Sequence, residues 1–242
     1  MARRVHRNLA AAAWRDVDDH RDPRGRRYAL CELLQLFVLG MCTGAQTLRD
    51  VENLARDITG VRHFGVKGCP SDTTMDRNAR VIDPAQIRPV VHRQVRKMHR
   101  SKQLTVQPHI GISLVAIDGK ALGTDPELKH PQAQLQSKTG TQLTVLRTLR
   151  AVHVSSEVKP VLDQMVIPAD AGEANTFVPF MESLLGAYGR TELLECMSVD
   201  AGFTSRANMH WLHARDIGFI AALKGDQPTI YEEAKRLLGV DD

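Results

Sequence analysis

Two aspartates, Asp118 and Asp200, are the residues whose setting points most directly to chemistry. Each follows a run of mostly apolar residues and precedes a small residue, Gly119 or Ala201. Such runs are typical of buried strands, so we expect each carboxylate at the end of a strand. Two adjacent carboxylates repel one another unless a cation lies between them, and Mg²⁺ prefers carboxylate, water and phosphate oxygens. The pair therefore predicts a site for Mg²⁺ or Mn²⁺ and metal-dependent phosphoryl transfer.

The elements that must position these aspartates follow residue 110. Alternating and apolar runs predict strands, and spacings of three and four residues predict helices. We expect strands at 112–117, 141–154, 159–168, 193–199 and 217–223, helices at 173–188, 205–215 and 228–238, and a polar loop at 123–140. This order of elements is that of the ribonuclease H-like fold, a mixed-sheet α/β fold. In it the strands of Asp118 and Asp200 are neighbours, about 4.8 Å apart.

The first part of the chain predicts a small all-α module. Apolar spacing indicates helices at 28–41, 47–58, 71–82 and 84–101, and Thr47 with Asp50 forms a capping pattern for the second. The segment 102–111, with Pro108 and Gly111, is the natural boundary. We therefore expect a helical, basic, DNA-binding domain at 1–105 and a ribonuclease H-like domain at 110–242.

The distribution of charge suggests a polyanionic partner. Residues 1–110 hold 20 Lys and Arg against 11 Asp and Glu, whereas residues 111–242 hold 12 against 17. A basic module beside an acidic one fits a protein that grips nucleic acid with one part and acts on it with the other. Residues 71–80 resemble a helix-turn-helix reader, although a plain helical bundle with a solvated cationic face fits as well. The candidate nucleic-acid contacts in this module are Arg77, Arg80, Arg93, Arg96, Lys97 and Arg100.

The cysteines and the apolar runs indicate the cellular compartment in which the protein is expected. The four cysteines are widely spaced and form no Cys-x-x-Cys pair, as expected of free thiols in a reducing environment. The longest apolar run, residues 29–42, is too short for a membrane span, and the N-terminus lacks the pattern of a secretion signal. We expect a soluble cytoplasmic protein.

Several motifs together resemble the DDE-class transposases of bacterial insertion sequences, and more narrowly their H-repeat-associated branch. In the second half these are Val-Ala-Ile-Asp-Gly-Lys at 115–120, Val-Asp-Ala-Gly-Phe at 199–203 and Ala-Leu-Lys-Gly-Asp-Gln-Pro at 222–228. In the first half, residues 22–24, 40–44, 48–52 and 71–74 resemble the associated domain of that family. The resemblance covers nearly the whole chain, and the order of the motifs makes it specific.

The resemblance carries expectations for individual residues. Asp118 and Asp200 match the first two metal-binding acids, and Lys120 and Lys224 lie in matching motifs as expected contacts to DNA phosphate. The implied activity is cleavage of a phosphodiester at the end of an insertion sequence, followed by strand transfer. The implied partners are double-stranded DNA, as element ends and target, and further copies of the chain in a DNA complex.

The family's third acid is a glutamate in a later motif, and the sequence stops at Asp242 before it. This departure predicts a catalytic domain that is incomplete at its C-terminus and inactive alone, a truncated remnant of a transposase. Glu232 and Glu233 are alternative sources of a third carboxylate, although acidic residues in the first turn of a helix commonly complement its dipole.

Two other functions remain open at this stage. A non-catalytic DNA-binding remnant or regulator needs the basic module but no complete set of acids. Actin-like ATPases and sugar kinases share the order of elements, but they need a phosphate loop rich in Gly, Ser and Thr after the first aspartate. Here that position reads Gly119, Lys120, Ala121 and Leu122. Nucleophilic hydrolases and His-based metalloproteases are not indicated, because neither Gly-x-Ser-x-Gly nor His-Glu-x-x-His occurs.

Overall fold

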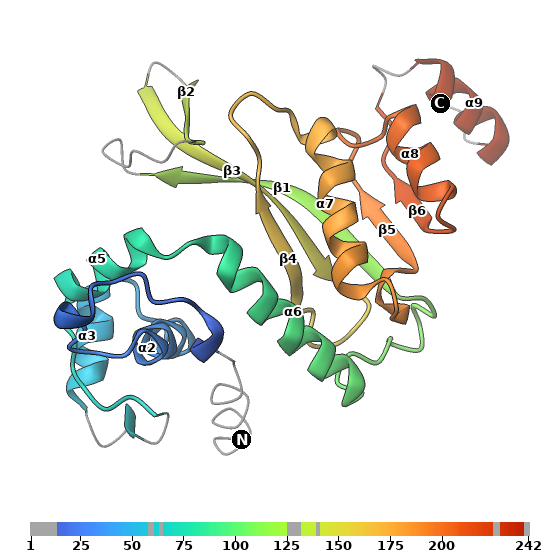
Figure 1. The fold of residues 1–242 in the computed structure, drawn as a ribbon. Coiled ribbons are helices and arrows are strands. Elements are labelled where there is room, and N and C mark those ends of the chain that lie inside the picture. The colour runs from blue at the N-terminus through green and yellow to red at the C-terminus, as the bar shows by residue number, and fades with distance from the viewer. Residues whose placement is uncertain are drawn as a thin grey trace. The chain divides into compact units, whose positions relative to one another are not determined.

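The computed structural model describes residues 14–57, 61–62, 65–124, 132–138, 141–224 and 228–239. The chain divides into two compact units, residues 1–94 and 95–242, whose elements are labelled in Figure 1. The division falls within helix α6 (Pro84–Arg100), and the domain boundary expected in the segment 102–111 stays a prediction. Helix α6 continues unbroken past the division, so its first part belongs to unit 1 and its last turns to unit 2.

Unit 1 is helical, as predicted. It contains α2 (Leu30–Thr43), α3 (Leu48–Arg56), α5 (Asp72–Val81) and the first part of α6, with short 3-10 turns η1 (Trp14–Asp16) and η2 (Pro23–Gly25). The expected cap at the start of α3 is confirmed. The Thr47 side chain accepts a hydrogen bond from the Asp50 backbone, and the Asp50 carboxylate accepts one from the Thr47 backbone.

Among the described residues of unit 1, two apolar clusters join the helices. One joins α2, α3 and α5 through Leu36, Leu39, Val51, Ala55 and Met75, all buried. The other joins the segment around Val17 to α2 and α6 through Leu30, Leu34 and Val90. No single helix among the described residues is long and apolar enough to cross a membrane. Only α2 and α3 taken together reach that length and composition, and they are bent by 102°.

The described residues of unit 2 form a mixed sheet of six strands. These are β1 (Leu114–Thr124), β2 (Gln134–Lys138), β3 (Thr141–His153), β4 (Val161–Val166), β5 (Cys196–Val199) and β6 (Gly218–Ala221). The order is β2-β3-β1-β5-β6, and β4 also pairs with β3. β1, β3 and β4 pair antiparallel, whereas β5 and β6 are parallel to β1. This is the predicted ribonuclease H-like topology, with β2 added at the edge.

Helix α7 (Glu173–Tyr188) supplies much of the core of unit 2. Its buried residues Phe177, Phe180, Met181, Leu184 and Tyr188 recur at helical spacing, so they form one apolar face. Figure 1 shows α7 lying over the sheet, and it contacts β3 and β4. The Tyr188 hydroxyl donates to the Leu162 carbonyl at 2.8 Å, which ties the end of α7 to β4. The remaining helical elements are η3 (Glu192–Leu194), α8 (Arg206–His213) and α9 (Pro228–Leu238).

Three expectations about the strands were wrong. The first strand begins at Leu114 and runs to Thr124, because pairing with the long β3 overrides the poor strand propensity of Gly119 and Lys120. The expected polar loop 123–140 contains the end of β1 and all of β2. Leu193 and Leu194 belong to η3 and not to the strand that follows. Within the expected loop, residues 125–131 and 139–140 lie outside the described part.

Candidate active site: two aspartates on neighbouring strands

The parallel pairing of β1 with β5 brings the two predicted acids together. Val115 pairs with Met197, Ala116 with Ser198 and Ile117 with Val199. Asp118 directly follows Ile117 and Asp200 directly follows Val199, so the backbones of the two aspartates lie side by side at about the spacing of adjacent strands, 4.8 Å. The carboxyl ends of parallel strands are where open α/β sheets place ligands. We call this position the acid edge.

Asp118 itself lies within β1 and not at its end. On the side of β3 it pairs with Arg150, and the ladder continues as far as Thr124. Its side chain is 52% exposed and forms an ion pair with Lys120, with Nζ 2.5 Å from Oδ2. Residues two apart on a strand point to the same face, so the pairing with Lys120 follows from strand geometry. The predicted contact residue Lys120 is thus brought to the acid edge.

Asp200 starts a tight turn directly after β5. Its Oδ1 accepts a hydrogen bond from the Gly202 backbone at 3.0 Å. Its carbonyl accepts from the Phe203 backbone at 3.2 Å and from the Thr204 hydroxyl at 3.1 Å. The side chain is exposed. Local bonds of this kind are typical of Asp at turns, and they hold the carboxylate at the surface of the acid edge.

A third carboxylate approaches β1 from the face that α7 covers. Glu173, the first residue of α7, packs against Gly119. A Cβ on Gly119 would lie 2.3 Å from Glu173 Oε1 and 2.6 Å from its Cδ, so only glycine leaves room for this carboxylate. Gly119 and Asp118 alternate along the strand, and Glu173 therefore lies on the opposite face from Asp118.

Sequence reasoning missed Arg150 and Glu173 as parts of this neighbourhood. Arg150 is the direct cross-strand partner of Asp118, so the two side chains share a face. The register of β1 against β3 was needed to see this, and it depends on where each strand ends. Glu173 is recognisable from sequence only as an acid in the first turn of a helix, because the close approach of α7 to Gly119 is a tertiary feature.

The acid edge offers oxygen ligands, the kind that hard divalent cations such as Mg²⁺ prefer. Asp118 and Asp200 offer exposed carboxylate oxygens on adjacent strands, the ligands that Mg²⁺ accepts together with water and phosphate. Across the described ranges, no three His, Cys, Asp or Glu side chains cluster closely enough to hold a metal. The alternative acid Glu233 is engaged by Arg236, whose Nε lies 2.9 Å from Oε2 and lowers the pKa of that carboxyl. Glu232 is exposed on the same helix.

The candidate nucleic-acid contacts of unit 1 differ in their surroundings. Arg77 lines a cleft of about 560 Å³ together with Arg27. Arg80 is paired with Asp76 at 2.8 Å and Arg93 with Asp16 at 3.0 Å. Of these three candidates, Arg77 is the one without an ion pair among the described residues. The helix-turn-helix resemblance of residues 71–80 stays a prediction, because part of the segment before α5 lies outside the described residues. Residues 57–71 separate α3 from α5, far more than the three or four residues of that motif.

The remaining cations lie in unit 2. Arg96, Lys97 and Arg100 are on the last turns of α6, where Arg96 is half-buried and the other two are exposed. Lys224 is exposed in the segment after β6. Of these four, the structure brings Arg96 and Arg100 to one side of α6, since they are four residues apart.

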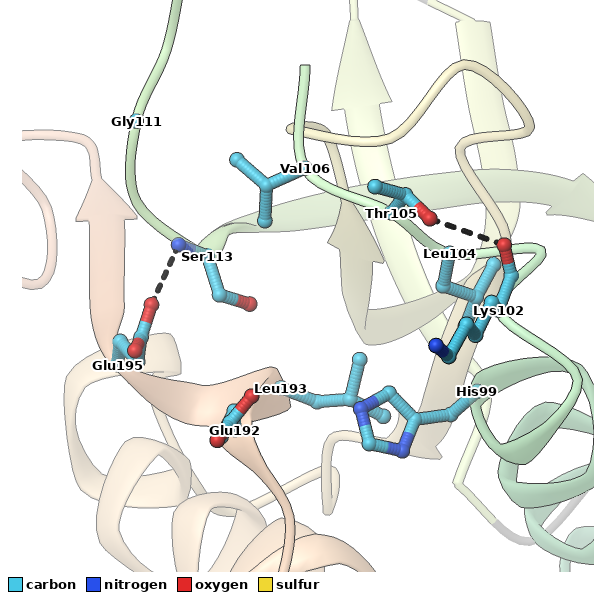
Figure 2. Close-up of a pocket in the computed structure, with 10 residues that line it drawn as sticks. All are labelled: His99, Lys102, Leu104, Thr105, Val106, Gly111, Ser113, Glu192, Leu193 and Glu195. Carbon is cyan, nitrogen blue, oxygen red and sulfur yellow. Dashed lines mark hydrogen bonds between the residues drawn. The ribbon is translucent and has the colours of Figure 1, made fainter. Parts of the chain in front are cut away.

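The pocket shown in Figure 2 lies elsewhere. Its lining includes Ser113, just before β1, and Glu195, just before β5, whose carboxylate accepts from the Ser113 backbone at 2.7 Å. Both residues precede their strands, whereas Asp118 and Asp200 lie toward the carboxyl ends. The pocket, about 340 Å³, is therefore at the opposite end of the sheet from the acid edge.

The fold and the site together define a ribonuclease H-like protein with paired aspartates. Comparison with known protein families and solved structures shows which proteins it resembles. Residues 12–94 match the family model described as DDE_Tnp_1-associated. This match confirms the resemblance to DDE-type transposases that the motifs indicated; the H-repeat-associated branch stays a prediction. No curated protein matches the chain in sequence.

Two solved structures are similar over most of the chain. One is the cryo-EM structure of a piggyBac transposase synaptic complex with hairpin DNA, at 13% identity, with a TM-score of 0.41, covering 91% of this chain and 48% of that one. The other is the crystal structure of the Mos1 strand transfer complex, at 16% identity, with a TM-score of 0.31, covering 87% and 63%. The chain thus spans about half the length of the first and less than two thirds of the second.

Proposed function

We propose that the chain is a DNA transposase of the DDE class, in which unit 2 cleaves and transfers DNA strands with a divalent metal ion at Asp118 and Asp200. The observation that supports this most is the register of β1 against β5, which sets the two aspartates side by side. The match of residues 12–94 to a transposase-associated family supports the same class. Bacterial insertion-sequence ends would be the substrate of the H-repeat-associated branch.

In this proposal Asp118 and Asp200 hold Mg²⁺ or Mn²⁺, which when bound activates the attacking oxygen and neutralises charge on the phosphate. The ion would replace Lys120 as the partner of Asp118. Lys120, half exposed at the acid edge, would then be free to contact DNA phosphate. The exposed turn at Asp200 leaves its second carboxylate oxygen accessible while the first is held by Gly202.

DNA would be gripped outside the acid edge as well. In unit 1 the proposed contact is Arg77, beside Arg27 in the same cleft. In unit 2 the proposed contacts are Arg96, Lys97 and Arg100 on α6, together with Lys224. Arg80 and Arg93 would contribute only after giving up their ion pairs with Asp76 and Asp16. Such contacts supply affinity that falls steeply with salt. A homo-oligomer of the chain in the DNA complex is also part of the proposal.

The test is cleavage of a labelled duplex that carries the DNA flanking the gene, with Mg²⁺ or Mn²⁺. Asp118→Asn and Asp200→Asn should each abolish cleavage while DNA binding persists. Glu192→Gln is the matched control, because it removes an exposed carboxylate at the far end of the sheet. Cleavage that survives both aspartate substitutions would contradict the proposal.

A non-catalytic DNA-binding protein is the second candidate. It needs only a cationic surface, such as the cleft of unit 1 that Arg27 and Arg77 line. Salt-dependent DNA binding without cleavage by the wild-type chain, in either metal, would select this function. The kinase-type alternative is disfavoured, because β1 runs on through Gly119 to Thr124 where such enzymes need a phosphate loop.

A further inference from the structure

Four polar residues form a row across four neighbouring segments of the sheet. Asp200 follows β5 and lies beside Asp118 on β1, which pairs with Arg150 on β3. Arg150 in turn pairs with Gln164 on β4. Directly paired residues on antiparallel strands point to the same face, so Asp118, Arg150 and Gln164 lie in line. Figure 1 shows β1, β3 and β4 adjacent in the sheet.

The Arg150 side chain is held by a hydrogen bond but forms no ion pair with a described residue. Its Nε donates to Gln164 Oε1 at 3.2 Å, which fixes one edge of the guanidinium. The neighbouring carboxylate of Asp118 is instead paired with Lys120. Arg150 is half-buried and has no ion-pair partner within the described segments. A half-buried guanidinium is stabilised by an anion or by hydrogen bonds, and the bond to Gln164 occupies only the donor on Nε.

The geometry of the side chain suggests what completes it. Guanidinium carries five N–H donors in a planar fork, and the bond to Gln164 uses the donor on Nε. The remaining donors, on the two terminal nitrogens, match a pair of phosphate oxygens in the bidentate arrangement that favours arginine over lysine. Cross-strand neighbours are about 4.5–5.5 Å apart at Cα, so such a phosphate would lie within one nucleotide of one held at the acid edge.

We propose that Arg150, oriented by Gln164, binds a phosphate of the DNA strand that is cut, at or next to the scissile position. This inference rests on the proposed function of the acid edge. It assigns the row a division of roles: the two aspartates face the metal ion, and Arg150 faces the non-bridging oxygens, where negative charge accumulates during phosphoryl transfer.

A structural role is the competing explanation, in which Arg150 merely balances Asp118 across the ladder. The two roles differ in what lysine can replace. A point charge would suffice for balancing charge, whereas bidentate phosphate recognition needs the fork. Gln164→Leu separates them further. It keeps the charge of Arg150 and removes only its anchor, so it should weaken phosphate binding and leave the charge balance of the sheet intact.

The first experiment measures duplex DNA binding without metal, at several salt concentrations, on the full chain. Arg150→Gln should weaken binding roughly tenfold, as expected for lost hydrogen bonds to a charged group, and lower the salt slope by about one. Arg150→Lys should keep most of the slope but not the affinity. Arg190 is an exposed arginine just after α7 and serves as the control. Arg190→Gln should change the affinity and the salt slope only by the small amount expected from removing one distant positive charge. An unchanged affinity in Arg150→Gln would overturn the inference.

The second experiment locates the phosphate. Substrates carry one uncharged methylphosphonate at the scissile position or at either neighbour. At one of the three positions, the methylphosphonate should lower the affinity of the wild type roughly tenfold relative to unmodified DNA. The same modification should hardly change the affinity of Arg150→Gln, because the variant has already lost the contact. Equal losses in wild type and variant at all three positions would show that Arg150 binds none of them. Because the first measurement uses binding alone, it remains decisive if the chain does not cleave DNA. In that case the proposed catalytic function fails, and a phosphate site at Arg150 stands without an assigned position on the DNA.

Discussion

Replacement of Gly119 by alanine should change the stability of unit 2 in opposite directions depending on what occupies position 173. In the native chain the new Cβ would lie 2.3 Å from Glu173 Oε1, whereas ordinary contacts begin near 3.4 Å. The carboxylate must therefore move by about 1 Å. In a Glu173→Ala background nothing obstructs the methyl group, and alanine in a strand is favoured over glycine.

The magnitudes follow from these two effects. Overpacking of this kind costs about 1–3 kcal/mol, and the low end applies because the obstructing atoms end a flexible side chain. Removing glycine from a strand returns about 0.5–1 kcal/mol. We expect Gly119→Ala to destabilise the native chain by about 0.5–1 kcal/mol and to stabilise the Glu173→Ala chain by about 0.5 kcal/mol. The coupling between the two sites is then about 1–1.5 kcal/mol, within the range for residues in contact.

Urea unfolding followed by tryptophan fluorescence provides the assay. The chain has two tryptophans, Trp14 in unit 1 and Trp211 in unit 2. In a Trp14→Phe background the signal reports unit 2 alone, so two-state analysis is applied to one unit. The four chains of the double-mutant cycle share this background. Gly119→Ala with the same sign in both backgrounds, or a coupling below about 0.3 kcal/mol, would refute the argument that Glu173 occupies the space over Gly119.

Three further outcomes follow from particular bonds. His153 is fully buried among three serine hydroxyls, and burial lowers its pKa, an effect that His99 reinforces. Below about pH 6.5 the unfolded chain therefore binds more protons than the folded chain. The urea midpoint of unit 2 should decrease as the pH is lowered from about 7.5 to about 5.5, and it should decrease less in His153→Gln. Thr47→Ala removes the cap of α3 and should cost unit 1 about 0.5–2 kcal/mol, read from Trp14 in a Trp211→Phe background. Tyr188→Phe leaves the buried Leu162 carbonyl unpaired and should cost unit 2 about 1–3 kcal/mol by Trp211 fluorescence.

Each of these has a result that would contradict it. An equal pH dependence in wild type and His153→Gln would assign the acid sensitivity to other groups. A Thr47→Ala chain as stable as a Thr47→Ser chain, which keeps the hydroxyl, would show that the cap contributes nothing. Tyr188→Phe without effect would mean that water replaces the lost hydroxyl at Leu162.

Much of the fold was accessible from the sequence because its signals are local. The helix 173–188 was predicted with the bounds that α7 has, since its apolar face repeats at helical spacing and Gly189 ends it. The capping pair Thr47 and Asp50 needed only a spacing of three residues. The adjacency of Asp118 and Asp200 followed from the order of elements, since that order fixes which strands are neighbours.

What sequence could not supply depends on pairing between distant strands. The continuation of β1 past Asp118 has no local signal, because glycine, lysine and alanine are poor strand formers. The register that sets Arg150 opposite Asp118 depends on that continuation. A shift of one residue would have turned Arg150 to the other face, so no amount of composition or spacing could have identified it.

The pairing of β1 also decides which of the two aspartates can adjust to a ligand. Asp118 is held in a continuous ladder against β3 from before to after its own position, so displacing its backbone would break hydrogen bonds on both sides. Asp200 lies beyond the last pair of β5 and is held by a short turn that closes on itself through Phe203 and Thr204. When an ion or a DNA strand of a given size is accommodated, the separation of the carboxylates should therefore change by rearrangement of the 200–204 turn, with β1 as the fixed reference.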